Sequence, residues 1–506
     1  MRFSSVRALL AAAALLLPTA ASAEWRKYDT NHFVIYSESP EKDVVRFATR
    51  LESIDGLLRL ATGVAATVNG PKLRIYQVAD DGQVERAIGA EGGSVAGFYS
   101  NNSLGPFAVT PRRLIGDVGA DFTPDLVLYH EYAHHFMLQY SPAVYPPWYV
   151  EGFAELIGSS RFMPDGRLAY GMPAKHRGEY ISEDWTPVQE VLLKPVGRQR
   201  DLDLYGQGWA LTHFLTFSKE RSPQLRQYLY ALSRGKGDQE AASAFGDLAR
   251  LNREAHRYAG AGSFSYRPVK VALTGPVILA SAVLSAGEAA LIPETIALDE
   301  GSLDSIKKPS NRARQQKLRD ANLERIRQKA ARFPGDPFAQ RLLGEAEFLA
   351  NNLSEAEAAT NRLLALQPNN VDGLARKSII LSARAEKAGG ARRAALAGEA
   401  RMLAVRANRL DTAASMPVVA FYHSFRAAGQ KAPDVAIDGL KAALDERPNT
   451  DEIRLLLVNE YEARGRYAEA IALIMMIANS PHDSPARDAG RVQLARMQAA
   501  SAAKGG

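Results

Sequence analysis

The sequence predicts two folds in succession, an α+β domain over residues 24–235 and an all-α domain of helical repeats over residues 331–500. Before residue 125, short segments rich in β-branched and aromatic residues alternate with an amphipathic helical pattern. After residue 331 the composition shifts to Ala, Leu, Arg and Glu with helical periodicity. Two prolines of that part, Pro334 and Pro368, lie 34 residues apart, which indicates a repeating unit.

The N-terminus has the pattern of a secretory signal peptide. Arg2 and Arg7 flank the start of an apolar run from Ala8 to Leu17, and the small residues Ala21-Ser22-Ala23 follow. We expect cleavage after Ala23, and the apolar run before it is too short to span a bilayer comfortably. No transmembrane segment is expected in the mature chain, because its longest apolar stretch, 273–291, is interrupted by Pro276, Gly287 and Glu288. The expected location is the periplasm or the extracellular medium.

The net charge and the cysteine content bear on the partners of the protein and on the source of its stability. The formal net charge is +6, and two of these charges belong to the signal peptide. Such a small excess gives no reason to expect nucleic acid as a partner. The 506 residues include no cysteine, so an exported protein of this kind must be stable through packing rather than through disulfides.

The first domain is expected to place several strands before a central helix. Strand-like segments lie at 32–37, 72–78, 95–99 and 107–110, and an amphipathic helix is expected over 41–61. We expect the strand at 107–110 to pair with an extended substrate by β-augmentation.

The central helix has clear boundary signals. Thr123 suits the N-cap and Pro124 the first helical position, and Ser141-Pro142 ends the helix. The helix is largely apolar, so burying histidines in it is costly unless they have a metal ion or specific hydrogen bonds.

This helix carries a metal-binding pattern. His130 and His134 are four residues apart, so both imidazoles lie on one helical face and can bind one metal ion. Glu131, beside the first histidine, stands where a metallopeptidase keeps its general base. The pattern is an HExxH zinc motif.

A catalytic zinc ion needs a third protein ligand and an open position for water. Glu151 follows on a second expected helix, after the proline-rich turn at 145–147, and Glu155 lies one turn further on the same face. The apolar neighbours Trp148, Phe153 and Leu156 favour a buried carboxylate over a solvated one. Glu151 is therefore the candidate third ligand.

The segments 130–135 (His-Glu-Tyr-Ala-His-His) and 148–156 (Trp-Tyr-Val-Glu-Gly-Phe-Ala-Glu-Leu) together resemble the gluzincin branch of the zincin metallopeptidases, the peptidase MA-like group. The resemblance covers about residues 25–235 and implies a zincin-like fold. It implies Zn²⁺ bound by His130, His134 and Glu151, and Glu131 as general base. Glu155 falls where related enzymes place a carboxylate that orients a ligand histidine.

Two departures from the best-known aminopeptidases of this group bear on the substrate. The spacing from His134 to Glu151 is slightly shorter, and the upstream Gly-x-Met-Glu-Asn exopeptidase segment is absent. An endopeptidase that takes a peptide or protein substrate is therefore expected.

Three further residues near these motifs have weaker patterns. Tyr205 begins another apolar helix and could donate its hydroxyl to a developing oxyanion, although an ordinary packed tyrosine fits equally well. His213 is expected to be a core histidine. His135 faces another side of the metal-binding helix, so it is not expected to be a ligand.

Residues 236–330 carry little signal and are expected to connect the two domains. The stretch 260–263 resembles a linker, 264–273 has room for one or two strands, and the basic stretch 307–329 predicts a solvated helix.

The C-terminal domain resembles tetratricopeptide repeats (TPR) over about 336–482. Leu343-Gly344 and Ala356 stand where that repeat packs small residues between its two helices, and a second unit runs from Asn449 to Pro481. Units at 371–408 and 415–448 fit with extra residues. Such repeats imply a concave surface that binds a peptide or partner protein, and a plain helical bundle is the alternative.

The leading functional hypothesis is an exported zinc metallopeptidase that cleaves envelope proteins and docks proteins through its repeats. One alternative is a periplasmic TPR scaffold or assembly protein whose zinc site is structural or vestigial. Another is a zinc amidohydrolase that acts on a non-protein envelope substrate, which motif spacing does not separate from proteolysis.

Overall fold

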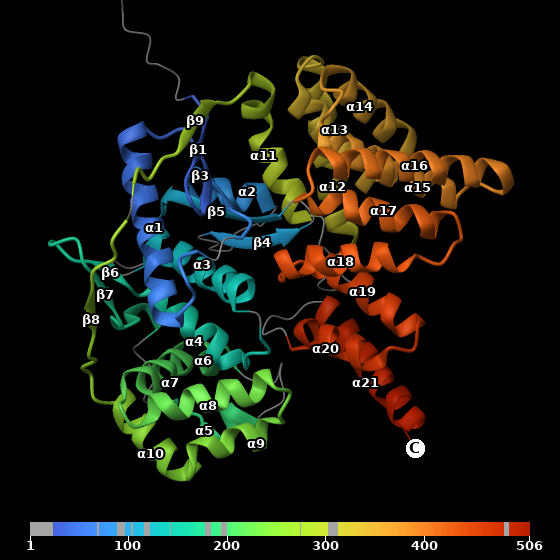
Figure 1. The fold of residues 1–506 in the computed structure, drawn as a ribbon. Coiled ribbons are helices and arrows are strands. Elements are labelled where there is room, and N and C mark those ends of the chain that lie inside the picture. Colours follow the sequence, from blue (N-terminus) through green and yellow to red (C-terminus); the bar gives the residue numbers. More distant parts are fainter. Residues whose placement is uncertain are drawn as a thin grey trace, which may run out of the picture.

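A six-stranded mixed sheet forms the centre of the N-terminal half of the molecule (Figure 1). The computed structural model describes residues 24–67, 70–88, 97–102, 105–115, 122–141, 143–177, 184–193, 200–273, 275–301, 312–479 and 485–505. The strand order is β4-β5-β3-β2-β1-β9. The strands are β1 (Arg26–Asp29), β2 (Phe33–Ser37), β3 (Leu73–Asp80), β4 (Phe98–Asn102), β5 (Gly105–Arg113) and β9 (Ala280–Val283).

Helices cover both faces of this sheet. On one face the sheet packs with α1 (Glu41–Thr62), α3 (Pro124–Tyr140) and α4 (Pro147–Gly158) around one apolar core. On the other face, α2 (Asp81–Ile88) and α11 (Ala286–Gly301) enclose a smaller core. The strands expected at 32–37, 72–78 and 107–110 and the helix expected over 41–61 are present, with ends shifted by a few residues. The strand expected at 95–99 begins outside the described residues, and its described part overlaps β4.

The position of β5 contradicts the expectation that residues 107–110 pair with substrate. Strand β5 lies inside the sheet, parallel to β3 on one side and antiparallel to β4 on the other, so its backbone groups are already used. Strand β4 lies at the end of the strand order instead. An extended chain could add to the sheet only there or beside β9.

A further group of helices and strands follows α4 in the chain. It contains a small sheet, β6 (Arg161–Phe162), β7 (Leu168–Tyr170) and β8 (Arg267–Val269), and the 3-10 turns η1 (Lys175–Arg177) and η2 (Ser243–Phe245). Its helices are α5 (Val188–Leu193), α6 (Asp201–Leu204), α7 (Gly206–Phe217), α8 (Arg221–Ser233), α9 (Asp238–Ala242) and α10 (Leu248–Ala259).

The stretch 236–330, for which the sequence predicts little, contributes to both sheets. Strand β8 pairs with β7, and β9 pairs with β1. Both strands are short and largely exposed, so they lack the alternating apolar pattern that would have indicated their partners. The solvated basic helix expected over 307–329 corresponds to α12 (Arg312–Arg332). Its buried side chains include Asn322, Ile326 and Ala330, and it packs against α11 and α13.

The C-terminal half consists of stacked helical hairpins, and in Figure 1 they lie beside the sheet domain. In the described part of the chain, four pairs follow α12, and α21 (Pro485–Gly505) packs on the last of them. The pairs are α13 (Pro337–Leu349) with α14 (Leu353–Leu366), α15 (Val371–Glu386) with α16 (Gly390–Leu410), α17 (Ser415–Ala427) with α18 (Asp434–Glu446), and α19 (Asp451–Ala463) with α20 (Tyr467–Ala478).

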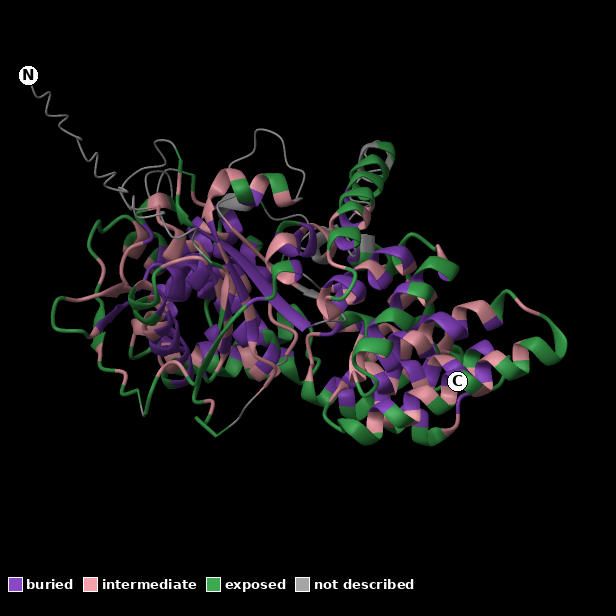
Figure 2. Ribbon diagram, turned by 90° about the horizontal axis from the view of Figure 1, so that it is seen from above, coloured by how far each residue is buried: buried purple, intermediate pink, exposed green. Residues whose placement is uncertain are grey.

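The repeat pattern seen in the sequence corresponds to this stacking. A Cβ added to Gly344 would lie 2.9 Å from Thr360 Oγ1, so this glycine allows α13 and α14 to approach closely. The poorly fitting unit at 371–408 contains α16, a helix of 21 residues, and this length accounts for its extra residues. Figure 2 shows buried and exposed residues alternating along these helices.

The signal peptide expected at residues 1–23 lies outside the described residues. Among the helices that the structure describes, none is both long and apolar enough to cross a membrane.

Candidate metal centre

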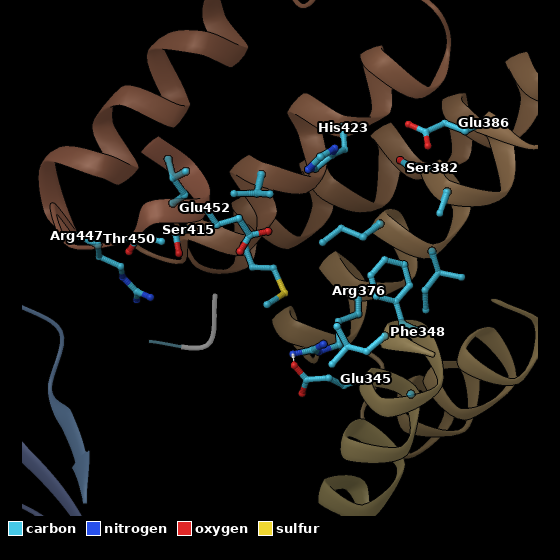
Figure 3. Close-up of a pocket in the computed structure, with 18 residues that line it drawn as sticks. Glu345, Phe348, Arg376, Ser382, Glu386, Ser415, His423, Arg447, Thr450 and Glu452 are labelled. Carbon is cyan, nitrogen blue, oxygen red and sulfur yellow. Dashed lines mark ion pairs between the residues drawn. The ribbon is translucent and has the colours of Figure 1, made fainter. Parts of the chain in front are cut away.

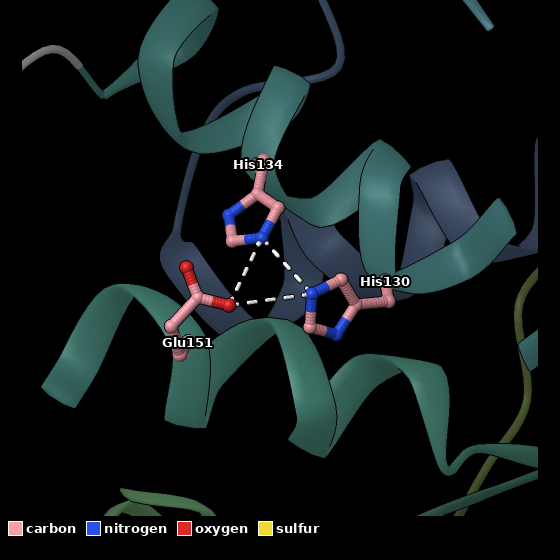
Figure 4. Close-up of side chains that lie close together, drawn as sticks. All are labelled: His130, His134 and Glu151. Carbon is pink, nitrogen blue, oxygen red and sulfur yellow. Dashed lines mark hydrogen bonds and ion pairs between the residues drawn. The ribbon is translucent and has the colours of Figure 1, made fainter. Parts of the chain in front are cut away.

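Helix α3 holds both histidines of the motif on one face. Its N-terminus is capped as the sequence predicts, because the Thr123 side chain accepts a hydrogen bond from the backbone N–H of Leu126 and Pro124 follows it. His130 and His134 point to the same side, toward α4 (Figure 4). Both side chains are buried, with exposed fractions of 8% and 7%.

Helix α4 brings Glu151 to the two histidines, and glycines make this packing possible. A Cβ on Gly158 would lie 3.2 Å from His130 Cβ, and a Cβ on Gly152 would lie 2.2 Å from the Gly208 carbonyl oxygen. The first contact joins α4 to α3 and the second joins it to α7. Any larger residue at 152 would push these helices apart.

The three candidate ligand atoms form a nearly equilateral triangle. His130 Nε2 and His134 Nε2 are 3.0 Å apart, and Glu151 Oε2 lies 3.4 Å and 3.5 Å from them (Figure 4). Ligand atoms of one tetrahedral zinc ion, each about 2.0–2.1 Å from the metal, lie about 3.3 Å from one another. Two imidazoles and one carboxylate with this spacing fit a zinc ion that keeps a fourth position open.

Glu155 lies behind His130, on the side away from this triangle. Its Oε1 atom is 3.4 Å from His130 Nδ1, so the carboxylate faces the ring nitrogen that would not bind the metal. His176 Nε2 lies 2.9 Å from Glu155 Oε2, and Arg177 Nε donates to Oε1 at 3.0 Å. The structure thus adds His176 and Arg177, which come from η1 and which no motif in the sequence singles out.

The carboxylates around His130 set its charge. Burial by itself lowers the pKa of His130, but the hydrogen bond with Glu151 and the charges of Glu155, Glu151 and Glu131 outweigh burial and raise the pKa to about 9. Burial likewise raises the pKa of Glu155, but His176, His130 and Arg177 lower it by more. The centre therefore strongly favours positive charge, as a cation site requires.

Glu131 and Tyr205 flank the same centre. Glu131 is half-buried, and its charge acts on both His130 and Tyr99. The Tyr205 ring stacks on His130 with ring centroids 6.1 Å apart, and the Arg177 guanidinium lies 4.7 Å from the centre of the Tyr205 ring. Tyr205 thus lies near the candidate ligand His130 and also packs against the apolar core around Trp148.

The other histidines in this region have structural partners. His213 is fully buried, its Nε2 donates to the Gly171 carbonyl oxygen at 2.9 Å, and Nδ1 lies 2.8 Å from the Tyr258 hydroxyl. It is a core histidine, as expected. His135 is on another face of α3 from the triangle, and its Nδ1 lies 3.2 Å from the Tyr99 hydroxyl. Burial lowers the pKa of His135 to about 3.

A second cluster of possible ligands, His32, Glu52 and Asp55, differs from the first in its hydrogen bonds. Glu52 accepts from the backbone and lies 2.6 Å from the ring of His32, and Asp55 accepts from Arg59 and from the Tyr132 hydroxyl. These oxygens already have protein donors. The cluster therefore ties α1 to α3 through Tyr132, on a side of α3 other than the one that carries the candidate ligands.

Comparison with known proteins identifies the C-terminal repeats. Residues 427–494 match the family model for the tetratricopeptide repeat. No curated protein matches the chain. Among solved structures, a thermophilic TPR protein of Thermus thermophilus matches with 23% identity and a TM-score of 0.32, over 36% of this chain and 92% of that one. The family match shows that the C-terminal half contains tetratricopeptide repeats, which indicate a role in protein–protein interaction.

Proposed function

We propose that this protein binds other proteins through its tetratricopeptide repeats and hydrolyses peptide bonds at a zinc ion held by His130, His134 and Glu151. Protein binding follows from the family match at 427–494. The observation that carries the hydrolytic part is the triangle of ligand atoms with sides of 3.0, 3.4 and 3.5 Å. We also propose that the protein is exported, because residues 1–23 have the pattern of a signal peptide.

The surrounding residues suit peptide hydrolysis. A zinc ion there would polarise a water molecule and the scissile carbonyl. Glu131 would accept a proton from the water and donate it to the leaving amine, the usual role of a carboxylate beside such a site. Glu155, held by His176 and Arg177, would keep His130 Nδ1 protonated so that Nε2 stays available as a ligand. The Tyr205 hydroxyl would stabilise the oxyanion.

Replacing the general base tests the catalytic part. In the E131Q variant we expect zinc to bind at one equivalent, as in the wild type, while hydrolysis of an unfolded protein such as casein falls by at least about 100-fold. Glu190→Gln, an exposed change on α5, is the matched control and should keep full activity. An E131Q protein that hydrolyses casein at the wild-type rate would rule out this mechanism.

A scaffold without catalysis is the competing function, and the family match supports it directly because the match concerns the repeats alone. The two functions differ in their dependence on metal. If the protein is a scaffold, no hydrolysis should be found with or without zinc. The purified protein should then either lack stoichiometric zinc or bind its partner proteins equally well after the zinc is removed. Metal analysis together with the casein assay separates the two.

A further inference from the structure

The repeats reach the metal-binding helix through one short turn between α18 and α19. The Gln139 side chain, near the end of α3, donates a hydrogen bond to the Glu446 carbonyl oxygen at 2.8 Å. Three residues later, Asn449 Nδ2 donates to the Tyr99 hydroxyl oxygen at 3.1 Å. Tyr99 belongs to β4, at the end of the main sheet, and the charge of Glu131 acts on it.

The direction of these hydrogen bonds links Asn449 to α3. An amide N–H only donates, so the Tyr99 oxygen is the acceptor in its bond with Asn449. The Tyr99 hydroxyl hydrogen is then left to point to His135 Nδ1, which lies 3.2 Å away. Two hydrogen bonds therefore run from Asn449 of the repeats, through Tyr99 of the edge strand β4, to His135. His135 is the residue that follows the candidate ligand His134.

The same turn forms one end of a groove in the repeats. The groove has a volume of about 560 Å³, and it is lined by residues of α13, α15, α17 and α19 (Figure 3). Most of the surface that lines it is apolar, and the charged side chains of Glu386, Arg447 and Glu452 also line it. Its Arg376 is already paired with Glu345 at 3.2 Å. Lining residues include Phe348, Ile380, Met416, Val419, Arg447 and Thr450. An extended polypeptide with apolar side chains fits this surface.

The turn is too tightly bonded for its residues to move independently. The backbone N–H of Thr450 donates to the Arg447 carbonyl oxygen at 3.1 Å, and the Arg454 guanidinium bonds to the Pro448 carbonyl. Arg447 and Thr450 face the groove, and Asn449 between them bonds to Tyr99. Displacement of the groove end of the turn must therefore displace Asn449.

We propose that the turn at 447–450 transmits occupancy of the groove to strand β4, which packs against the helix that carries the candidate ligands, by way of Asn449 and Tyr99. A polypeptide in the groove would shift the turn, weaken the Asn449–Tyr99 bond and loosen β4 against α3. Control of catalysis by this loosening rests on the proposed function, whereas the coupling between the groove and β4 does not.

The absence of cysteine allows the groove to be filled artificially. In a Met416→Cys variant of the full chain, pyrene maleimide would attach inside the groove. Hydrogen–deuterium exchange of peptides that cover β4 and α3 then measures how fast the backbone amides of these two elements exchange. We expect amide exchange in β4 to become about tenfold faster after labelling, the factor that corresponds to losing one typical hydrogen bond.

Two controls decide whether the effect passes through the turn. Met402→Cys places the same label on α16 at a side chain that is 69% exposed and does not line the groove, and it should leave β4 unchanged. Asn449→Asp keeps the size of the side chain but removes its N–H donor, so it should give fast β4 exchange without the label, and labelling at position 416 should add nothing. Asn459→Asp on α19 is the matched control for this charge change.

Unchanged β4 exchange in labelled Met416→Cys would overturn the proposal, as would a label effect of full size on the Asn449→Asp background. Circular dichroism of each labelled protein checks that the helices remain folded. Because exchange needs neither zinc nor hydrolysis, a wild-type protein that fails to bind zinc would defeat the proposed catalysis and leave this test intact.

Discussion

At the residue scale, Glu155 joins two parts of the chain that the sequence separates. Its two oxygens meet His130 of α3 and the pair His176 and Arg177 of η1. A carboxylate held in this way fixes the tautomer and the orientation of a ligand histidine. The sequence identifies Glu155 because it lies one helical turn after Glu151, whereas His176 has no such relation to either motif.

His176→Gln should weaken zinc binding by about 10- to 100-fold, because Glu155 would lose one of its partners and His130 would be less firmly oriented. Competition with a chromophoric chelator measures the zinc dissociation constant. His256→Gln, which changes a ring stacked on Trp185, serves as the control and should bind zinc normally. Equal affinities in the two variants would show that His176 does not act on the metal centre.

At the element scale, the candidate metal centre depends on how closely α3, α4 and α7 pack. Helix α4 contacts both α3 and α7, and the glycines at these crossings have no side chain to hold the helices apart. The segment 148–152 (Trp-Tyr-Val-Glu-Gly) thus determines how α4 packs in this fold. Trp148 fills the core behind α4, and Gly152 leaves space for α7.

Gly152→Ala should destabilise the protein by about 3 kcal/mol, because the new methyl group would collide with the Gly208 carbonyl oxygen. Urea unfolding measures the loss. Gly237→Ala is the control, since φ is −66° there and no atom lies within 4 Å of the added Cβ. It should change stability by less than about 1 kcal/mol. A Gly152→Ala protein as stable as this control would contradict the packing argument.

The repeats contain a charge network that predicts a pH dependence. Burial raises the pKa of Asp372, but Arg376 and Arg341 outweigh it and hold the pKa below its ordinary value. A carboxyl whose folded pKa is depressed contributes stability above its unfolded pKa of about 4, and this contribution is lost as the pH falls through the folded pKa.

Asp372→Asn should therefore cost about 1–3 kcal/mol at pH 7, because the Arg376 side chain loses the carboxylate that accepts its Nε–H at 2.9 Å. The difference from the wild type should shrink as the pH falls below about 4. Urea titrations at several pH values test this, with the exposed Asp438→Asn on α18 as the control. A cost that stays constant down to the lowest pH would exclude the charge network as its source.

At the scale of the whole molecule, the two domains meet at α3 and β4. Asn449 and Tyr99 are 350 positions apart in the chain but form a hydrogen bond, and the Glu446 carbonyl accepts from Gln139 of α3. A protein-binding surface and a candidate hydrolytic centre therefore share one boundary. This arrangement is what makes communication between them testable.

Zinc should stabilise the N-terminal domain if it binds the folded state only. At a free concentration about 100 times the dissociation constant the gain is about 2.7 kcal/mol, which corresponds to about 5–10 °C in the melting temperature of the N-terminal domain. Calorimetry with and without a chelator measures the shift. His130→Ala should abolish it, whereas His256→Ala should not. Identical melting of the wild type with and without zinc would exclude a zinc site of this affinity.

The sequence by itself predicted the features that depend on neighbours along the chain. The cap at Thr123, the four-residue spacing of His130 and His134, and the repeat around Gly344 follow from helical geometry, which is local. Helical periodicity also predicted that the C-terminal half is a stack of hairpins, because each unit repeats the same pattern.

Only the tertiary structure decided which distant segments meet. It made β4 rather than β5 the edge strand and added β8 and β9 from the stretch 236–330. It also brought His176 to Glu155 of α4 and Asn449 to Tyr99 of β4. No periodic pattern in the sequence predicts these contacts, because packing between segments far apart in the chain depends on the shape of the whole core. Local patterns therefore predicted the candidate ligands, and long-range packing determined what holds them in place.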